Sequence, residues 1–119
     1  MHKLILSSSS RAVATHTSAA FTTEGYSGIR VFTDVTDANG GSVTPVVQTL
    51  DQVSGNWVNI PGGAFAAIST NTTKLLTIRP GVAETANESV SDSPGSTIRI
   101  SVPVGTAAVT FSMGMDLIR

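Results

Sequence analysis

Apolar and polar residues alternate along several short stretches of this chain, which is the pattern of β-strands that bury one face. The clearest stretch is Ile29–Thr36, whose predicted inward face carries residues that fit a pleated sheet, namely Ile29, Val31, Thr33 and Val35. Phe32 interrupts the otherwise polar opposite face. We therefore expect Phe32 to contact a second layer or a partner.

The same alternation returns between groups of turn residues and predicts further strands. These strands cover Thr44–Leu50, Trp57–Ile60, Lys74–Arg79, Thr97–Val102 and Ala108–Ile118. Asn39-Gly40 predicts a hairpin between the strands on either side of it, and Val104-Gly105-Thr106 predicts a second one at the end of the chain. Pro61-Gly62-Gly63 is expected to end a strand, and Ala64–Ile68 is either a bent strand or part of a loop.

No segment keeps a period of 3.6 residues over the length of a helix, so little or no helix is expected. About six to nine short strands, separated by turns, indicate an all-β fold, an antiparallel β-sandwich that is jelly-roll-like or immunoglobulin-like. Within a single domain, residues 1–23 are predicted to form an N-terminal arm with one or two edge strands. Residues 24–119 are predicted to form the sandwich core.

The stretch Gly81–Ser96 is rich in Ser, Glu, Asp and Ala and shows no period. A loop of this length inside a small domain is usually functional or mobile. We therefore predict that Gly81–Ser96 is a contact region.

Composition excludes several classes of function but adds little to the prediction of the fold. The 119 residues carry a net charge of −1, only 13% of them are charged, and the seven basic residues are scattered, so no nucleic-acid-binding patch is predicted. So little charge on a surface rich in Ser, Thr, Ala and Gly favours a protein whose surface is partly covered by neighbours, such as a homo-oligomer. No signal peptide or membrane span is predicted, so we expect synthesis in the cytoplasm, no secretion and no membrane partner.

The residues that catalysis or metal binding would need are few. Cysteine is absent, and His2 and His16 are the only histidines. No Gly-x-Ser-x-Gly turn frames a nucleophile, and the carboxylates are dispersed. Asp37-Ala38-Asn39-Gly40 resembles the start of a calcium loop, but no glutamate stands at the twelfth position, and a turn explains the same residues. The prediction is a protein that is not an enzyme and has no catalytic, metal or cofactor site.

A carbohydrate-binding platform would need several coplanar aromatic rings. Trp57 and Tyr26 are the only tryptophan and tyrosine. Trp57 is therefore interpreted as a core residue or an interface anchor.

Several segments, in their order along the chain, carry a resemblance to a known family. They are Glu24–Phe32, Thr44–Asp51, Ser54–Gly62, Leu76–Gly81, Ile98–Val102 and the closing Phe111-Ser112-Met113. The chain resembles small β-sandwich virion structural proteins of tailed bacteriophages, over about residues 24–118. Members tend to read Gly-Tyr, strand, Val-Thr, turn, Gln, Asp, Gly, Trp, Ile-Pro and to end in a hairpin.

This resemblance implies a head decoration (cement) or minor capsid protein that binds the major capsid protein on the outer surface of the virion, often as an oligomer, with a trimer favoured. The expected contact regions are Met1–Arg11 and Gly81–Ser96. A tail-tube or tail-tip component is the close alternative, and the absence of a predicted helix favours the head. A glycan-binding module on the particle surface is the alternative from a different class, and it would need Trp57 or Tyr26 to be exposed beside Asp or Asn side chains.

Overall fold

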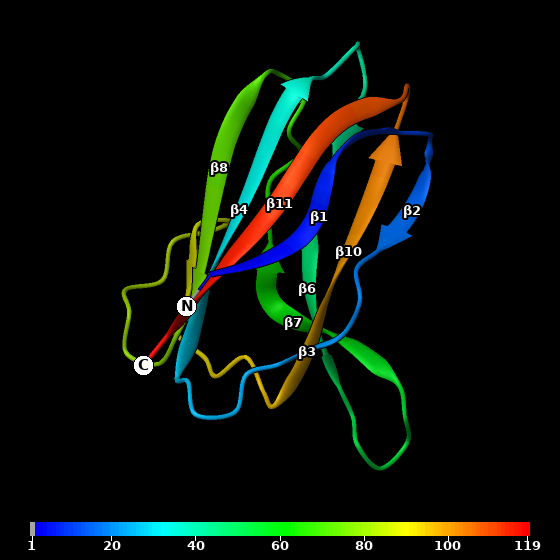
Figure 1. Ribbon diagram of the computed structural model, residues 1–119. Helices are drawn as coiled ribbons and strands as arrows, with labels where there is room; N and C mark the ends of the chain where they lie inside the picture. The colour runs from blue at the N-terminus through cyan, green and yellow to red at the C-terminus, as the bar shows by residue number, and fades with distance from the viewer. Residues whose placement is uncertain (1) are drawn as a thin grey trace.

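The computed structural model describes residues 2–119, which form 11 β-strands in two facing sheets and no helix (Figure 1). The strands are β1 (His2–Arg11), β2 (Ala14–Thr17), β3 (Phe21–Thr22), β4 (Gly28–Asp37), β5 (Ser42–Val43), β6 (Val46–Leu50), β7 (Trp57–Ala64), β8 (Thr72–Ile78), β9 (Ser89–Val90), β10 (Thr97–Gly105) and β11 (Val109–Ile118). The predicted all-β sandwich is confirmed.

The strand order identifies the sandwich as a jelly roll. Sheet 1 has the order β1-β11-β4-β8-β9, and sheet 2 has the order β2-β10-β6-β7, with β3 and β5 also paired to β10. When β2 is counted with β3, β5 with β6, and the two-residue β9 is set aside, eight strands remain in two sheets of four. The chain crosses from one sheet to the other after every one of these strands except β6, which forms a hairpin with β7. This double-sheet arrangement is the jelly-roll alternative of the sequence prediction.

Alternating side chains of both sheets fill the space between them. On β4 the predicted inward residues are all buried, since Ile29, Val31 and Thr33 have no exposed surface and Val35 is 2% exposed. The inward residues of β10 and β11 are buried in the same way: Ile98, Ile100, Val102, Val109, Phe111, Met113, Met115 and Leu117. Full burial of one such apolar side chain stabilises the fold by about 1.5–3 kcal/mol. The period of two in the sequence therefore reports the core correctly.

Both predicted hairpins are wrong about pairing, although both turns form. Asn39 and Gly40 have φ of 51° and 76°, and Thr106 has φ of 73°. The turn after β4 leads into sheet 2, and the turn after β10 leads back into sheet 1, so neither joins paired neighbours. These two turns pack on each other: a Cβ added to Gly41 would lie only 2.3 Å from the carbonyl oxygen of Ala107.

The prediction that Pro61-Gly62-Gly63 ends a strand is also wrong. These residues lie inside β7, where the register shifts between the pairs Gln48–Asn59 and Val46–Ala64. Such a bulge lets the strand bend away from its ladder. The ambiguous stretch after it ends β7 at Ala64 and continues as a loop, in which Phe65 is 2% exposed, Ala66 and Ala67 are exposed, and Ile68 pairs with Val43.

The N-terminal stretch, expected to be an arm, is incorporated in the sandwich. From His2 onward it forms β1, which pairs antiparallel with β11 from His2–Asp116 to Arg11–Val109. Figure 1 shows β1 at the edge of sheet 1, where His2 pairs with Asp116 near the C-terminus. Met1, the first residue of the expected contact region, lies outside the described residues. β2 and β3 then form the edge of sheet 2.

Candidate interaction surfaces

The structure does not gather the histidines and carboxylates of residues 2–119 into one cluster. His2 contacts Asp116 through Nδ1 and the carboxylate, and the Nε2 of His16 lies 2.8 Å from the carbonyl oxygen of Ala12. Asp37 is exposed at the end of β4. Residues 2–119 contain no group of three or more His, Asp or Glu side chains that could hold a metal ion. In the same range there is no helix long and apolar enough to cross a membrane.

Asp51 sits in the exposed loop of the β6–β7 hairpin. Its Oδ2 accepts a hydrogen bond from the Ser54 hydroxyl at 2.7 Å, and its Oδ1 accepts one from the backbone N–H of Val53 at 3.0 Å. These bonds, the one from Ser54 first, hold the pKa of Asp51 below its usual value. The carboxylate therefore organises this turn.

The two aromatic rings that a glycan site would use are both occupied by arginines. The guanidinium of Arg99 lies 4.6 Å from the centroid of the half-buried Trp57 ring, and that of Arg119 lies 5.3 Å from the Tyr26 centroid. Arg99 also donates to Gln48 Oε1 at 2.7 Å. These contacts cover ring surface that a sugar would stack on.

The outer face of sheet 1 carries an apolar row that runs across its strands. Register places Leu4 of β1 beside Gly114 of β11, Gly114 beside Phe32 of β4, and Phe32 beside Leu75 of β8. Leu4 is 70% exposed and Leu75 is 41% exposed, while Phe32 is partly exposed. Gly114 has no side chain to cover the phenyl ring. We call Leu4, Phe32 and Leu75 the Phe32 row.

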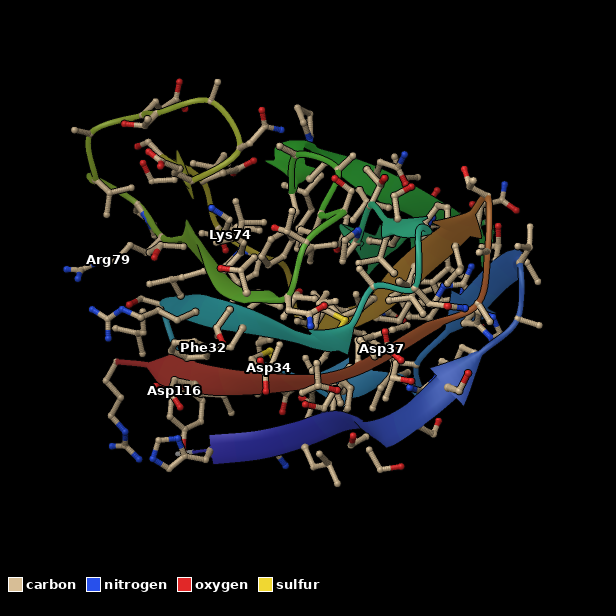
Figure 2. All side chains as sticks on the ribbon, turned by 90° about the horizontal axis from the view of Figure 1, so that it is seen from above. Phe32, Asp34, Asp37, Lys74, Arg79 and Asp116 are labelled. Carbon is tan, nitrogen blue, oxygen red and sulfur yellow. The ribbon has the colours of Figure 1, made fainter. Side chains whose placement is uncertain are left out.

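Polar and charged side chains border the Phe32 row on both sides. Toward one end of the strands, register continues from His2 through Asp116 and Arg30 to Thr77. Toward the other end, Asp34 accepts a hydrogen bond from the Thr73 hydroxyl at 2.9 Å. Figure 2 labels Phe32 and Asp34 on β4 and Asp116 on the neighbouring strand β11. An apolar centre with a polar rim is the general layout of a protein–protein contact.

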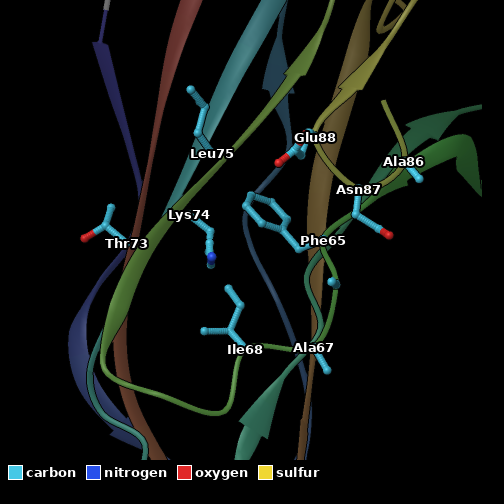
Figure 3. Close-up of a pocket in the computed structure, with 10 residues that line it drawn as sticks. Phe65, Ala67, Ile68, Thr73, Lys74, Leu75, Ala86, Asn87 and Glu88 are labelled. Atoms are coloured by element: carbon cyan, nitrogen blue, oxygen red, sulfur yellow. The ribbon is translucent and has the colours of Figure 1, made fainter. Parts of the chain in front are cut away.

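A second surface feature is a groove of about 550 Å³ where the two sheets part beside β8. The residues that line it come from the bend after β7, from β8 and from the long loop (Figure 3): Phe65, Ala66, Ala67, Ile68, Thr73, Lys74, Leu75, Ala86, Asn87 and Glu88. Lys74 follows the inward register of Thr33 but is exposed, because the sandwich is open at this edge.

The loop 81–96 that borders this groove is held by its own hydrogen bonds. The backbone N–H groups of Glu88 and Ser89 both donate to the carbonyl oxygen of Thr85 at 3.0 Å, and the Ser89 hydroxyl donates to the carbonyl oxygen of Ala83 at 2.6 Å. The side-chain amide of Asn87, which has φ of 62°, donates to the carbonyl oxygen of Ala64 at 3.0 Å. The loop is therefore tied both to itself and to β7.

The strand order defines a jelly-roll protein. Solved structures with this arrangement include the PBSX exported protein XepA, which matches with a TM-score of 0.66 and 9% identity over 99% of this chain and 37% of its own. A chain of infectious bursal disease virus, Gx strain, matches with a TM-score of 0.54 and 9% identity over 97% of this chain and 30% of its own. A chain of the Gt strain gives 0.51 and 15% over 99% and 32%.

These likenesses show the fold. The present chain spans about a third of the length of the chains that it matches. No sequence-family model and no curated protein matches it.

The sequence predicted only parts of these surfaces. Phe32 stood out as an apolar residue on a polar face, and Gly81–Ser96 stood out by its length. The Phe32 row was missed because Leu4, Phe32 and Leu75 become neighbours only when the strand order is known. The groove was missed because residues 64–68 gave no clear pattern.

Proposed function

We propose that this protein is a structural component of a tailed-phage virion, a capsid decoration or cement protein that binds the outer head surface. The proposal rests on the jelly-roll fold, on the resemblance of residues 24–118 to such proteins, and on the fact that chains of infectious bursal disease virus share the fold. The observation that carries it is the Phe32 row, an exposed apolar row with a polar rim on the open face of sheet 1.

In this function the protein bridges subunits of the shell. Each copy lays the Phe32 row on the major capsid protein, so that opening the shell must also break these added contacts. Covering the Phe32 row removes mainly apolar surface from water, and this burial contributes about 25 cal/mol of binding free energy per Å². Many identical copies sum small individual energies through multivalency. We favour a trimer, because a three-fold position of a shell offers three identical contact sites.

Both contact regions proposed from the sequence adjoin these surfaces. β1 supplies Leu4 to the Phe32 row, and residues 86–88 of the long loop line the groove. A position on the head is preferred to one on the tail, because residues 2–119 contain no helix of the kind that tube proteins usually add.

Co-sedimentation with heads purified from a mutant of the phage that lacks this chain tests this function, because the binding sites on such heads are empty. We expect the wild-type protein to pellet with the heads and the variant Phe32→Ser to lose at least tenfold in affinity. Val58→Ser is the matched control, because Val58 is 53% exposed on the other sheet and lies outside the row. If Phe32→Ser folds and binds as well as the wild type, the Phe32 row is not the contact surface. If the wild type does not bind heads at all, the decoration function is wrong.

A further inference from the structure

The outer edge of β8 is paired at only one of its ends. Along its inner edge β8 pairs with β4 from Thr72–Val35 to Ile78–Ile29. On the outer side β9 runs parallel to the last two residues only, where the backbone N–H of Thr77 donates to the carbonyl oxygen of Glu88 at 2.9 Å. The N–H of Arg79 donates to the carbonyl oxygen of Val90 at 3.1 Å. Within residues 2–119, most of the outer edge of β8 therefore has no neighbouring strand.

The backbone groups at this edge can be assigned from the alternation of a strand. Because the N–H groups of Thr77 and Arg79 point outward, those of Thr73 and Leu75 point outward as well. No backbone partner for these outward groups is found within residues 2–119. Two N–H donors and two carbonyl acceptors thus stand free beside the groove. An unpaired edge of this kind is a template for another strand.

The groove beside this edge offers side-chain contacts of a definite kind. Phe65 and Ile68, which are 2% and 3% exposed, form its apolar part. Lys74 is exposed in the groove and has no ion-pair partner among residues 2–119. Figure 3 shows Lys74 and Glu88 on different parts of the lining, with Phe65 between them. An acidic group would be attracted to the Lys74 side and repelled from the Glu88 side, which gives the groove a direction.

We propose that the edge of β8 at Thr73–Leu75 binds an extended peptide segment of a partner protein, which adds a strand to sheet 1 in line with β9. The segment places an apolar side chain against Phe65 and Ile68 and a carboxylate against Lys74. Strand addition of this type takes affinity from backbone hydrogen bonds and specificity from alternate side chains. The free edge suits a short segment, because its five residues, Thr72–Leu76, span about 17 Å at the usual rise of a strand. This inference does not depend on the virion function.

Amide hydrogen exchange of the free protein tests the open edge. The N–H groups of Thr73 and Leu75 are expected to exchange at least 100-fold faster than those of Lys74 and Leu76, which point toward β4. Equal protection of all four amides would mean that the edge is already covered, and the proposal would then be wrong.

Selection from a displayed library of random octapeptides tests the partner. We expect enriched peptides to alternate apolar and polar residues and to carry an acidic residue, to shift the NMR amide signals of Thr73 and Leu75, and to bind Lys74→Glu at least tenfold more weakly. Lys3→Glu, which changes the only other lysine at the opposite edge of sheet 1, is expected to leave binding unchanged. A selection without enrichment, or peptides that bind Lys74→Glu as well as the wild type, would overturn the proposal.

Discussion

Replacement of Thr33 by valine should stabilise this protein. Thr33 lies on the inner face of β4 with no exposed surface, and its hydroxyl oxygen has no hydrogen-bond partner within residues 2–119. A buried polar group without a partner costs about 1–3 kcal/mol. Valine keeps the branched shape and adds an apolar methyl group worth about 0.8 kcal/mol on burial, which strain from the larger side chain partly offsets. We expect a net gain of about 1–2 kcal/mol in the free energy of unfolding.

Guanidinium denaturation, followed by Trp57 fluorescence, measures this gain as a higher midpoint with an unchanged slope. In a chain of 119 residues the unfolding entropy converts 1 kcal/mol into about 4 °C, so the melting temperature should rise by about 4–8 °C. Two controls separate the hydroxyl from the rest. Thr33→Ser keeps the hydroxyl, loses a methyl group and should destabilise by about 1 kcal/mol, whereas Thr15→Val, at an exposed edge position, should change stability by less than about 0.5 kcal/mol. A Thr33→Val protein no more stable than the wild type would refute the reasoning.

Three further predictions follow from local geometry. Gly41→Ala should lower the free energy of unfolding by about 3 kcal/mol, because the added Cβ would lie 2.3 Å from a backbone oxygen. Gly40→Ala should lower it by only about 1 kcal/mol, because Gly40 has φ of +76° but open space around it, and equal losses would contradict the packing of the two turns. An NMR titration should find the pKa of Asp51 below its usual value, and Ser54→Ala should raise this pKa; an unchanged pKa would refute the cause. Because the pKa of Asp51 is lowered in the folded state, the stability that its carboxylate contributes is present above about pH 4 and is lost as the pH falls through the folded-state pKa. Arg99→Lys should lower the free energy of unfolding by about 1 kcal/mol and change the fluorescence of Trp57, because lysine cannot keep both the ring contact and the hydrogen bond of the guanidinium. An unaltered fluorescence spectrum would contradict the ring contact.

The sequence predicted which residues face the core more reliably than it predicted which strands pair. Ile29–Thr36 and Thr97–Val102 alternate as strands do, and the apolar residues predicted to face inward are buried as expected. Asn39-Gly40 predicts a hairpin turn, yet it joins the two sheets. A positive φ allows a tight reversal in either case, so turn residues report that the chain reverses and not which strand lies beside it.

The surfaces depend on contacts between distant parts of the chain. Leu4 and Leu75 lie 71 positions apart in the numbering but share a row through Gly114 and Phe32. No local pattern encodes this neighbourhood, because it arises when β11 inserts between β1 and β4. The bend inside β7 was missed for a related reason. Pro61-Gly62-Gly63 commonly ends strands, and it lies inside one here because the residues on either side of it, Asn59 and Ala64, pair with Gln48 and Val46 of β6.

Quantitative mass spectrometry of purified particles tests the proposed function most directly. Particles from the phage that encodes this chain would be separated into heads and tails, and copies of the chain would be counted against the major capsid protein in each fraction. A decoration protein is expected in the head fraction at a fixed ratio to the capsid subunits. Its confinement to the tail fraction would move it to the tail, and its absence from both fractions would contradict a structural function in the virion.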